Sequence, residues 1–293
     1  MSPISTTPEP MFLTAADARR MEAAEEHAAV HHARFTRKMR PGAGAAWEEF
    51  GGGHLAFVAK GSPVGRAHGL GFAGKVTPQD IEHVEHFYFE RQSDAQVDVC
   101  PYADPSLFES LNQRGFYVAE FNMTLARWIS PRDEFASQPQ QIELRRIRRG
   151  EETAWIALLA KVFFAQQAVQ FEELFLPWAS AENPMCLAAF LGGKMVAGAG
   201  GILIPEHRMA GCFGAVTLPE FRGRGLQRAF LAARLLAAQQ AGCDLAVTLT
   251  MPGTISQRNA ERAGFRTAYT KVVVKKPFSP AVAASPDPPT IPR

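Results

Sequence analysis

Cysteine is scarce in this chain of 293 residues, which has four cysteines, all widely separated. They are Cys100, Cys186, Cys212 and Cys243, and no two of them form a Cys-x-x-Cys pair. This spacing does not support a zinc ribbon, a thioredoxin-like redox motif or a dense disulfide framework. We therefore expect free thiols in a reducing cytoplasm.

Long apolar runs and a strong charge imbalance are also missing. No uninterrupted apolar stretch approaches the ~18 residues of a membrane span, and residues 1–12 lack the basic and apolar regions of a signal peptide. The 31 Lys and Arg residues against 29 Asp and Glu residues give a net charge of +2, which provides no argument for nucleic-acid binding. With 46% hydrophobic and 20% charged residues, the composition is that of a globular protein. The sequence predicts a cytoplasmic protein without a membrane or nucleic-acid partner.

The length is about twice the ~150 residues that serve as a rough guide for one domain. A polar segment with two prolines, SPRDEFASQPQQ at residues 130–141, lies near the midpoint and is the best linker candidate. We predict an N-terminal domain at residues 11–130, a linker at 131–141, a second domain at 142–276 and a proline-rich, flexible tail at 277–293.

The two halves resemble each other in one segment, Val97–Arg127 in the first half and Ala246–Lys276 in the second. In each segment a strand-like apolar run ends at a proline, a short helical stretch stops at Gly-Phe, and a long alternating strand follows. A repeat spacing of about 150 residues indicates a duplicated domain rather than a solenoid.

Strands and helices alternate in the second half. Apolar runs predict strands at residues 142–148, 185–191, 195–204, 212–218 and 244–251, and helical spacing predicts helices at 151–164 and 226–241. These patterns predict an α/β (α+β) fold of two similar domains, each with a mixed, mostly antiparallel central sheet flanked by helices.

The segment most informative about chemistry is Val216–Ala229, where a strand ends and a basic, glycine-rich loop leads into a helix. The first turn of a helix has backbone N–H groups without intrahelical partners, and the helix dipole favours an anion there by roughly 0.3–1 kcal/mol. Gly223 and Gly225 have no side chain, so a phosphate can approach their backbone closely. Three arginines add cations suited to a pyrophosphate, namely Arg222, Arg224 and Arg228.

The run Arg222-Gly-Arg-Gly225 resembles the pyrophosphate-binding motif of the GNAT superfamily of acyl-CoA-dependent N-acetyltransferases, in which Arg/Gln-x-x-Gly-x-Gly/Ala opens the central helix. The resemblance covers residues 142–276, where the order of the expected strands and helices is also similar. Together with the duplication, it implies a tandem GNAT-like protein. It also implies acetyl-CoA as co-substrate and, as acceptor, an amine of a small molecule or peptide.

The resemblance also implies roles for particular residues. Val216 and Thr217 end the strand whose backbone pairs with the pantetheine arm of CoA, and the loop that follows wraps the pyrophosphate. Ser256 and Asn259 lie where the family approaches the arm and thiol of CoA. The implied cofactor-binding set is Val216, Thr217, Arg222, Gly223, Arg224, Gly225, Leu226, Gln227, Arg228, Ser256 and Asn259.

The sequence departs from the family's pattern at three places. Gln227 stands where Gly or Ala is usual, which is tolerable if its side chain turns outward. Ala260 takes the position of a tyrosine that often protonates the leaving thiolate, and residues 209–212 lack the glutamate that many members use as a base. Tyr269 could substitute as the acid, although a tyrosine on a strand more often serves packing. Catalytic residues are therefore not assigned, and positioning of the amine with a water relay can suffice.

The corresponding loop of the first half has no glycine-rich turn, and its acidic residues would repel a pyrophosphate: Asp80, Glu82 and Glu85. We therefore predict that the first copy does not bind CoA. Residues 69–74 formally match Gly-x-Gly-x-x-Gly, but Pro78 follows and no helix opens at Gly74. Ordinary strand glycines are the expected interpretation there.

The remaining polar and aromatic clusters have plain interpretations. Two histidine pairs have helical spacings that could chelate a metal, His27 with His31 and His83 with His86, but such pairs are usually solvated and no metal is predicted. The acidic pairs at residues 151–152 and 172–173 are expected at helix starts and on exposed faces. The aromatic stretch 162–178 could wall an acceptor pocket, with core packing or an inter-domain contact as the alternative.

The sequence thus predicts an N-acetyltransferase whose C-terminal domain transfers an acetyl group from acetyl-CoA to an amine. The N-terminal copy is expected to pack against it and shape the acceptor site. One alternative is a non-catalytic acyl-CoA-binding or regulatory module, suggested by the missing tyrosine and glutamate. Another is an acyltransferase that uses a different acyl group or a different acceptor. The acceptor and the oligomeric state are not predicted.

Overall fold

A computed structural model describes residues 13–135, 142–164, 168–181 and 184–280, with only the backbone of residues 168–173. The helices are α1 (Ala15–Met39), α2 (Pro78–Phe89), α3 (Ser106–Gln113), α4 (Glu152–Phe164), α5 (Ala168–Ala179), α6 (Leu226–Gln240) and α7 (Ile255–Arg262). The strands are β1 (Ala46–Phe50), β2 (Gly53–Phe57), β3 (Ala67–His68), β4 (Ala95–Val99), β5 (Tyr117–Trp128), β6 (Glu143–Arg146), β7 (Leu187–Leu191), β8 (Lys194–Ile204), β9 (Met209–Thr217), β10 (Leu245–Thr250) and β11 (Arg266–Lys276). Within these ranges, no helix has the length and apolar character needed to cross a membrane.

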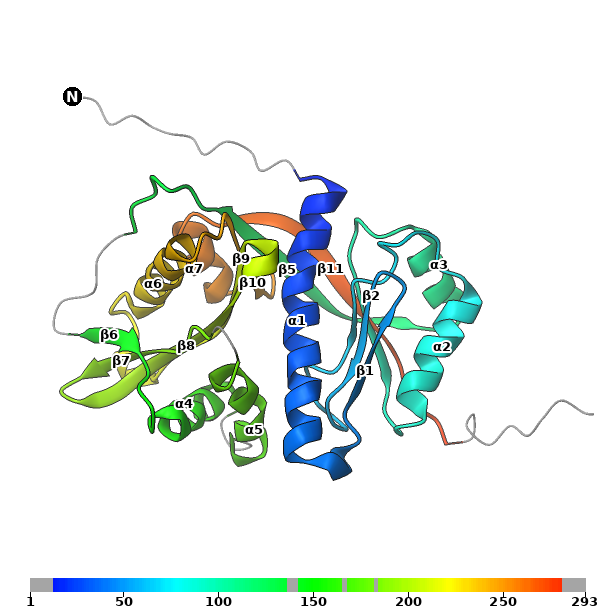
Figure 1. Ribbon diagram of the computed structural model, residues 1–293, viewed down its shortest axis with the longest axis horizontal. Helices are drawn as coiled ribbons and strands as arrows, with labels where there is room; N and C mark the ends of the chain where they lie inside the picture. The colour runs from blue at the N-terminus through cyan, green and yellow to red at the C-terminus, as the bar shows by residue number, and fades with distance from the viewer. Residues whose placement is uncertain (1–12, 136–141, 165–167, 182–183, 281–293) are drawn as a thin grey trace, which may run out of the picture.

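The strands form one sheet of 11 strands, in the order β1-β2-β3-β4-β11-β5-β10-β9-β8-β7-β6. Neighbouring strands are antiparallel except in two pairs, β3 with β4 and β9 with β10. The predicted mixed, mostly antiparallel α/β fold is therefore confirmed. The expectation that each half has its own central sheet is corrected, because strands of the two halves pair directly at the centre (Figure 1).

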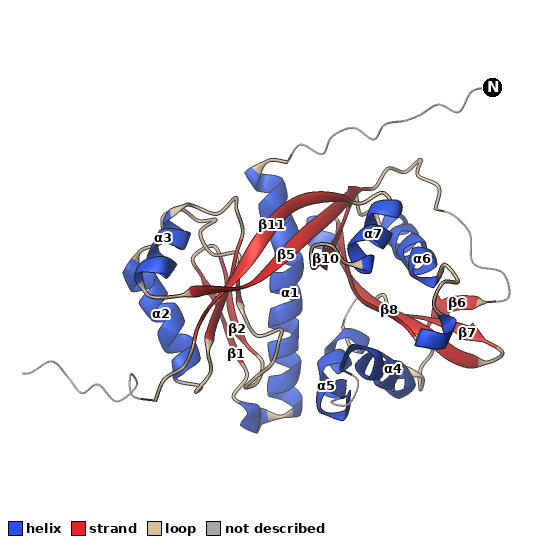
Figure 2. Ribbon diagram, turned by 180° about the vertical axis from the view of Figure 1, so that it is seen from behind, coloured by secondary structure: helices blue, strands red, loops and turns tan. Residues whose placement is uncertain are grey.

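The last strand of each half is built into the other half. β11 lies between β4 and β5 of the first half, and β5 lies between β11 and β10 of the second. The two strands are long, with 12 residues in β5 and 11 in β11, and pair with each other along most of their length. Figure 2 shows them crossing the middle of the molecule. An alternating pattern specifies the face that a strand buries but not its neighbour, so the sequence could not predict this exchange.

The boundary predicted from the sequence falls between β5 and β6. Residues 136–141 of the predicted linker and residues 281–293 of the predicted tail lie outside the described residues. The domain limits 11–130 and 142–276 stay a prediction, with the added observation that the two segments share one sheet.

Two layers of helices cover the sheet. One face, which we call the α1 face, packs against α1, α4 and α5, and the other, the α6 face, packs against α2, α3, α6 and α7. α1 crosses the centre of the molecule between the two halves (Figure 1). Thr14 and Asp17 form a capping box that begins α1, and Ala18 and Met21 on its first turns pack in one cluster with Val247 of β10.

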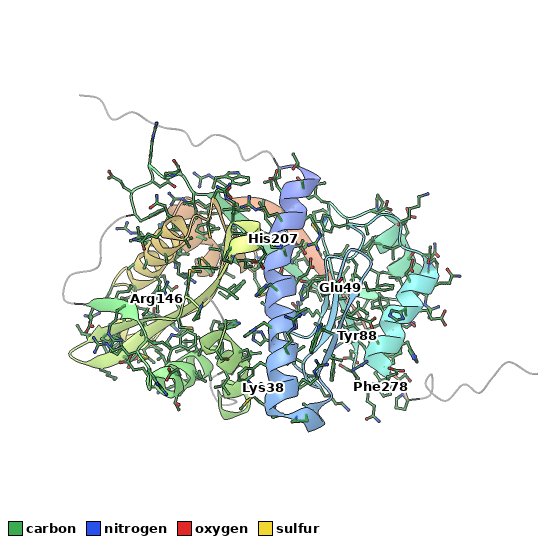
Figure 3. The ribbon with its side chains drawn as sticks, in the orientation of Figure 1. Lys38, Glu49, Tyr88, Arg146, His207 and Phe278 are labelled. Carbon is green, nitrogen blue, oxygen red and sulfur yellow. The ribbon has the colours of Figure 1, made fainter. Side chains whose placement is uncertain are left out.

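Polar contacts tie α1 of the first half to two segments of the second. Arg20 donates from Nε to the backbone oxygen of His207 at 2.6 Å and from Nη2 to that of Arg208 at 2.9 Å. Figure 3 shows His207, in the turn between β8 and β9, beside α1. Further along the helix, His31 Nε2 lies 2.8 Å from the backbone oxygen of Pro177 in α5. The N-terminal half thus packs against the second half through α1 in addition to the paired strands.

A buried ion cluster joins α1 to strands of both halves. The side chain of Lys271 on β11 is fully buried, and its Nζ lies 3.2 Å from Glu22 Oε2 on α1 and 3.3 Å from Asp98 Oδ2 on β4. It also contacts the Glu25 carboxylate. Burial opposes the charged form of Lys271, but the carboxylates of Glu22 and Glu25 hold its pKa well above its usual value. Buried charges are tolerated only with close partners, so this cluster determines how α1 and β11 fit together.

We predict that replacing the buried ammonium destabilises the whole protein. Lys271→Met should lower the free energy of unfolding by about 3–5 kcal/mol, because it leaves the Glu22 and Asp98 carboxylates buried without their main cation. The matched control is Lys275→Met on the same strand, whose ion pair with Asp94 is about one third exposed and should contribute at most about 1 kcal/mol. Urea unfolding measures both, and equal midpoints would contradict the role of the cluster.

A second prediction concerns the exchanged strands. A fragment of residues 142–280 should not fold, because removal of β5 leaves the facing edges of β10 and β11 without the strand that separates them. Full-length protein cleaved at a protease site inserted between residues 131 and 141 should remain a folded two-fragment complex. Circular dichroism and gel filtration measure both outcomes. A cooperative unfolding transition of the isolated fragment would show that the exchange is dispensable.

Candidate functional site

β9 and β10 run in parallel and part toward their carboxyl ends. The last pair in their register is Cys212 with Thr248, although both strands continue further. Phe213 and Leu249, the first residues beyond this pair, are partly exposed in the middle of the sheet. We call the place where the two strands part the splay.

A bulge in β9 causes the strands to part. The register of β8 against β9 shifts between Gly198 and Gly200, and Gly214 in β9 has a φ of +52°. On the α1 face the indole of Trp178 covers Gly214 so closely that a Cβ there would lie 2.3 Å from Cζ3 of the ring. Only glycine therefore fits this position, both for its φ and for its lack of a side chain.

Arg234 of α6 holds the same bulge from the α6 face. Its buried guanidinium donates from Nη1 to the backbone oxygens of Gly200 at 2.8 Å and Phe213 at 3.2 Å. Burial lowers the pKa of Arg234, and no carboxylate of the described residues forms an ion pair with it. Carbonyl oxygens freed by the bulge thus take the place of a counter-ion.

The loop after β9 leaves room for an anion at the start of α6. Gly223 and Gly225 have φ values of +77° and +76°, and a Cβ added to either would meet nothing within 4 Å. Gly225 is the N-cap of α6 and provides no side-chain cap, whereas threonines cap α1, α2 and α7. Leu226 is buried and anchors the helix. The first N–H groups of α6 therefore have no side-chain acceptor from the cap residue.

Cations surround this helix start. Arg222, Arg224 and Arg228 are exposed, as the predicted pyrophosphate contact requires. Arg224 and Lys194 both lie over the ring of Phe221, at 5.7 Å and 5.5 Å from its centroid. Lys194 belongs to the β7–β8 hairpin, and sequence reasoning missed it because no local pattern connects that hairpin to the loop.

Val216 and Thr217 are buried at the end of β9, directly before the loop. Arg222 Nε donates to the backbone oxygen of Thr217 at 3.3 Å, and Gln227 Nε2 donates to its Oγ1 at 3.2 Å. The side chain of Gln227 thus turns back toward β9 rather than outward. Its amide is long enough to reach back from the first turn of α6 to the strand, and it connects the two.

Ser256 and Asn259 lie on α7, which follows β10. Because β9 and β10 are parallel, their carboxyl ends meet at one edge of the sheet, and the loop and α7 both begin there. Ser256 is exposed and Asn259 partly exposed. The fold thus brings all the predicted cofactor-binding residues to the edge where the splay opens.

The usual acid and base positions carry no titratable group that could serve. Ala260 is buried in the core, and residues 209–212 form the buried start of β9. The hydroxyl of Tyr269 donates to Glu22 Oε1 at 2.7 Å, and burial raises its pKa. Its proton is thus committed to the ion cluster, which agrees with a packing role. Burial also raises the pKa of the Cys212 thiol, so this side chain is not a reactive thiolate.

The equivalent place in the first half is filled by the protein itself. β3 and β4 are also parallel, and β3 ends at a turn at Gly69. Glu26 of α1 packs so closely on this turn that a Cβ on Gly69 would lie 2.1 Å from its Oε1. At the start of α2, Asp80 accepts a hydrogen bond from the Thr77 backbone N–H at 2.7 Å, so the helix cap is satisfied internally. These contacts favour the prediction that the first copy does not bind CoA.

Two expectations about the first half need correction. Glu85 does not face an approaching phosphate, because it is buried and paired with Arg114 at 2.7 Å and Lys276 at 2.8 Å. The glycines at positions 69, 71 and 74 do not belong to a strand but to a turn in which all three have positive φ. Positive φ is incompatible with a regular strand, and spacing alone does not reveal it.

Three of the four histidines, His27, His31 and His83, contact other elements, whereas His86 contacts the C-cap residue of its own helix. His27 lies 3.6 Å from Glu206, and His86 lies 2.6 Å from Glu90 on its own helix. His83 pairs with Glu48. The sequence does not predict a role for His32. Its ring nitrogens both lie within hydrogen-bonding distance of backbone oxygens, Nδ1 at 2.7 Å from that of Ala28 and Nε2 at 3.0 Å from that of Leu174.

One group of potential metal ligands was not predicted, namely Glu25, His68 and Asp98, whose ligand atoms lie within 4.8 Å of one another. The ammonium of Lys271 already contacts the carboxylates of Glu25 and Asp98. Lysine thus supplies the cation that the carboxylates require.

The acidic pair at 151–152 serves a helix start, as predicted. Glu151 accepts from Arg145 at 2.7 Å and 2.8 Å, and Glu152 accepts from the Gly150 backbone at 2.6 Å. The side chains of the second pair, at 172–173, lie outside the described ones. The aromatic rings of this stretch contact one another: Phe163, Phe164 and Phe175 form one group, and Phe175 also contacts Trp178. These contacts favour a packing role between α4 and α5.

We predict that the bulge is sensitive to a single methyl group. Gly214→Ala should cost about 2–4 kcal/mol, because it combines a strained φ with a clash against Trp178. Gly193→Ala in the β7–β8 turn is the matched control: its φ of +78° is equally strained, but the space around it is open, so about 1 kcal/mol is expected. Thermal unfolding compares the two, and an equal loss would mean that Trp178 yields freely.

Comparison with known proteins agrees with this geometry. Residues 152–265 match the acetyltransferase (GNAT) family. No curated protein matches the chain.

Solved structures show the same fold. A GCN5-related N-acetyltransferase from Kribbella flavida is similar with a TM-score of 0.60 and 17% identity over 86% of this chain and 97% of that one. A tandem GNAT protein from the clavulanic acid biosynthesis pathway has a TM-score of 0.60 and 14% identity over 92% of this chain and 98% of that one. A GCN5-related N-acetyltransferase from Sphaerobacter thermophilus has a TM-score of 0.50 and 16% identity, and the match covers 69% of this chain and 65% of that protein's length.

The family match covers the splay, the glycine-rich loop, α6 and α7. At such low identities the solved structures speak for the fold alone, and they extend the likeness across both halves. The match to the acetyltransferase (GNAT) family thus holds for the domain that contains residues 152–265.

Proposed function

We propose that the C-terminal domain, residues 142–276, binds acetyl-CoA and transfers its acetyl group to an amine. The observation that carries this proposal is the meeting of the splay and the uncapped start of α6 at one edge of the sheet. The family supports acyl transfer from acyl-CoA to an amine, and the acetyl group is the finer part of the proposal.

The pyrophosphate of CoA fits the start of α6. This helix has 15 residues, begins at a glycine without a side-chain cap and is surrounded by exposed arginines. Backbone N–H groups and the helix dipole favour a phosphate there. Arg222, Arg224 and Arg228 would pair with its oxygens, with Gly223 and Gly225 allowing close approach and Leu226 and Gln227 holding the turn.

The pantetheine arm fits the splay. Beyond Cys212 and Thr248, β9 and β10 no longer pair with each other, so the backbone at Val216 and Thr217 is available on that side. An arm with amide groups can add to such an edge as a strand does. Ser256 and Asn259 on α7, the helix that follows β10, would face the arm from the β10 side of the splay.

The transfer itself requires little beyond positioning. The lone pair of the amine nitrogen forms the C–N bond with the thioester carbonyl carbon, the C–S bond breaks, and the sulfur takes the electron pair. The proton lost by the nitrogen ends on the sulfur, directly or through water. Because Ala260 and residues 209–212 bring no acid or base, alignment of amine and thioester supplies the main acceleration.

The N-terminal half acts as a degenerate copy that completes the fold. It supplies β5 to the sheet beside β10 and lays α1 across the α1 face, on which the acceptor would approach. The acceptor is proposed to be an amine of a small molecule or peptide. The reducing cytoplasm is the proposed compartment, in agreement with four buried cysteines that form no disulfide.

A specific observation favours a second candidate. The absent acid and base would also suit a module that binds acyl-CoA and regulates another process without turnover. Binding of acetyl-CoA is common to both proposals, and only turnover separates them.

The binding site is tested by thermal unfolding with and without acetyl-CoA. At a concentration of 100 times Kd, ligand binding contributes about 2.7 kcal/mol, which should raise the Tm by about 5–10 °C. The double variant Arg222→Ala/Gly225→Glu should lose this shift, because it removes a cation and places a carboxylate at the helix start. Arg149→Ala/Gly150→Glu is the matched control, because it makes the same changes in an exposed loop before α4.

Free-thiol release from acetyl-CoA across a panel of amines separates the enzyme from the regulatory module. Turnover with any amine that depends on Arg222 would support the transferase. Binding without turnover across the panel would favour the regulatory module, and no Tm shift at saturating acetyl-CoA would refute both.

A further inference from the structure

A cavity of about 170 Å³ lies between the two halves, beside the last turns of α1. The first half contributes α1 and the turn after β2, and the second half contributes Leu174 of α5. The loop before α6 has no residue in the described lining, so the cavity is separate from the proposed CoA site. The described lining residues are His32, Thr36, Arg40, Val58, Ala59, Lys60, Gly61, Ser62, Pro63 and Leu174.

The turn after β2 brings two polar side chains to the lining. The Ser62 backbone N–H donates to the backbone oxygen of Ala59 at 3.1 Å, and Gly61 has a φ of +77°, as the third position of a type II turn requires. This turn places Lys60 and Ser62 on the cavity. The hydroxyl of Ser62 is enclosed and has no hydrogen-bond partner among the described residues. Rotation about its Cα–Cβ bond can bring it to a ligand, which would supply the missing partner.

Positive charge gathers at this end of α1, which Lys38 marks in Figure 3. Four exposed cations near the end of the helix and in the turn form no ion pair within the described ranges, namely Arg34, Arg37, Lys38 and Lys60. Arg34 and Arg37 lie instead over the ring of Trp47, at 5.4 Å and 3.9 Å from its centroid. These cations are thus available to an anionic ligand.

The helix dipole explains only part of this charge. Cations are favoured at the C-terminal end of a helix, and Arg37 and Lys38 lie in the last turn of α1. Lys60 lies on a separate turn, and Asp94, a carboxylate with which it interacts electrostatically, is paired with Lys275 at 2.7 Å. Within the described residues, the charge of Lys60 thus has no partner of its own.

His32 lines the cavity without adding charge. It is buried, and burial lowers its pKa to about 4, so the ring is neutral at pH 7. Its two nitrogens face backbone oxygens of α1 and α5, which commits the ring to joining these helices. The side chains that can hold a ligand therefore include the ammonium of Lys60 and the hydroxyls of Ser62 and Thr36.

We propose that this cavity binds a small phosphate monoester, with its phosphate group held by Lys60, Ser62 and Thr36. A phosphate carries a charge of about −1.5 to −2 at neutral pH and three acceptor oxygens. It therefore matches an ammonium, two hydroxyls and nearby exposed arginines better than a carboxylate does with its single charge. One water fills about 30 Å³, so the cavity has room for a small organic group beside the phosphate.

The ligand would connect the two halves near the bulge but outside the CoA site. Leu174, which lines the cavity from the second half, precedes Trp178 by one turn of α5, and Trp178 covers Gly214 of the bulge. Occupancy would therefore hold α5, and with it the cover of the bulge, against α1. The site goes beyond the proposed function, because it requires neither acetyl-CoA nor acyl transfer.

Calorimetry with glycerol 3-phosphate tests the site. The wild type should bind it with a Kd of about 1 mM or lower and should bind inorganic phosphate more weakly, because free phosphate leaves part of the cavity empty. Lys60→Met/Ser62→Ala should weaken binding of the ester at least about 10-fold, because it removes one charged and one neutral hydrogen bond. The matched control is Lys75→Met, which removes an exposed ammonium elsewhere in the first half and should retain the wild-type Kd.

A second comparison separates the cavity from the start of α6, which also suits a phosphate. Arg222→Ala/Gly225→Glu should retain the binding of glycerol 3-phosphate that Lys60→Met/Ser62→Ala loses. In protein labelled with ¹⁵N-glycine, the amide signal of Gly61 should shift on titration with the ester, and this shift should disappear in Lys60→Met/Ser62→Ala. Without ligand, the Tm of that variant should stay within about 2 °C of the wild type, because the groups it removes have no partners.

Several results would overturn the proposal. If the wild type does not bind glycerol 3-phosphate at about 10 mM, or if Lys60→Met/Ser62→Ala keeps the wild-type Kd, the cavity is not a phosphate site. Loss of binding in Arg222→Ala/Gly225→Glu alone would place the phosphate at the start of α6 instead. Tighter binding of inorganic phosphate than of the ester would refute the assignment to a monoester. The Tm shift with acetyl-CoA remains a separate test of the proposed function.

Discussion

The exchange of β5 and β11 between the two halves is the constraint on which the rest of the structure depends. β11 of the second half lies between β4 and β5, and β5 of the first half lies between β11 and β10. The sheet therefore continues from β1 to β6 without a boundary. Lys271 of β11 is buried against Glu22 of α1 and Asp98 of β4, and these charges tolerate no other arrangement at low cost. The ion cluster therefore specifies β4 as a neighbour of β11, which the alternating pattern of β11 does not specify by itself.

The same arrangement makes the two halves differ at their parallel strand pairs. Both contain a parallel strand pair, but α1 covers the one in the first half, with Glu26 against the turn at Gly69. In the second half Trp178 and Arg234 hold a bulge that keeps β9 and β10 apart. The first half is closed at this place by its own side chains, and the second half has a splay beside a helix without a side-chain cap.

Local patterns predicted the glycine-rich loop and the helix after it well. The loop at 216–228, its glycines and its exposed arginines occur as expected, because strand end, loop and helix start are consecutive in the chain. Predictions failed where an outcome depends on distant partners. Glu85, for example, pairs with Lys276, almost two hundred residues away. Lys194 had no signal in the sequence that connects it to the site.

The sequence by itself determined the α/β class and the glycine-rich loop that precedes a long helix, and it predicted the duplication, the phosphate role of that loop and the missing acid and base. Turn residues, helix caps and periodic apolar faces act within a few residues and can be interpreted without the fold. Only the tertiary structure decided that the two halves share one sheet and that α1 lies across its centre. Strand partners and buried charges are set by burial over the whole chain, where a residue's surroundings come from segments far away in sequence.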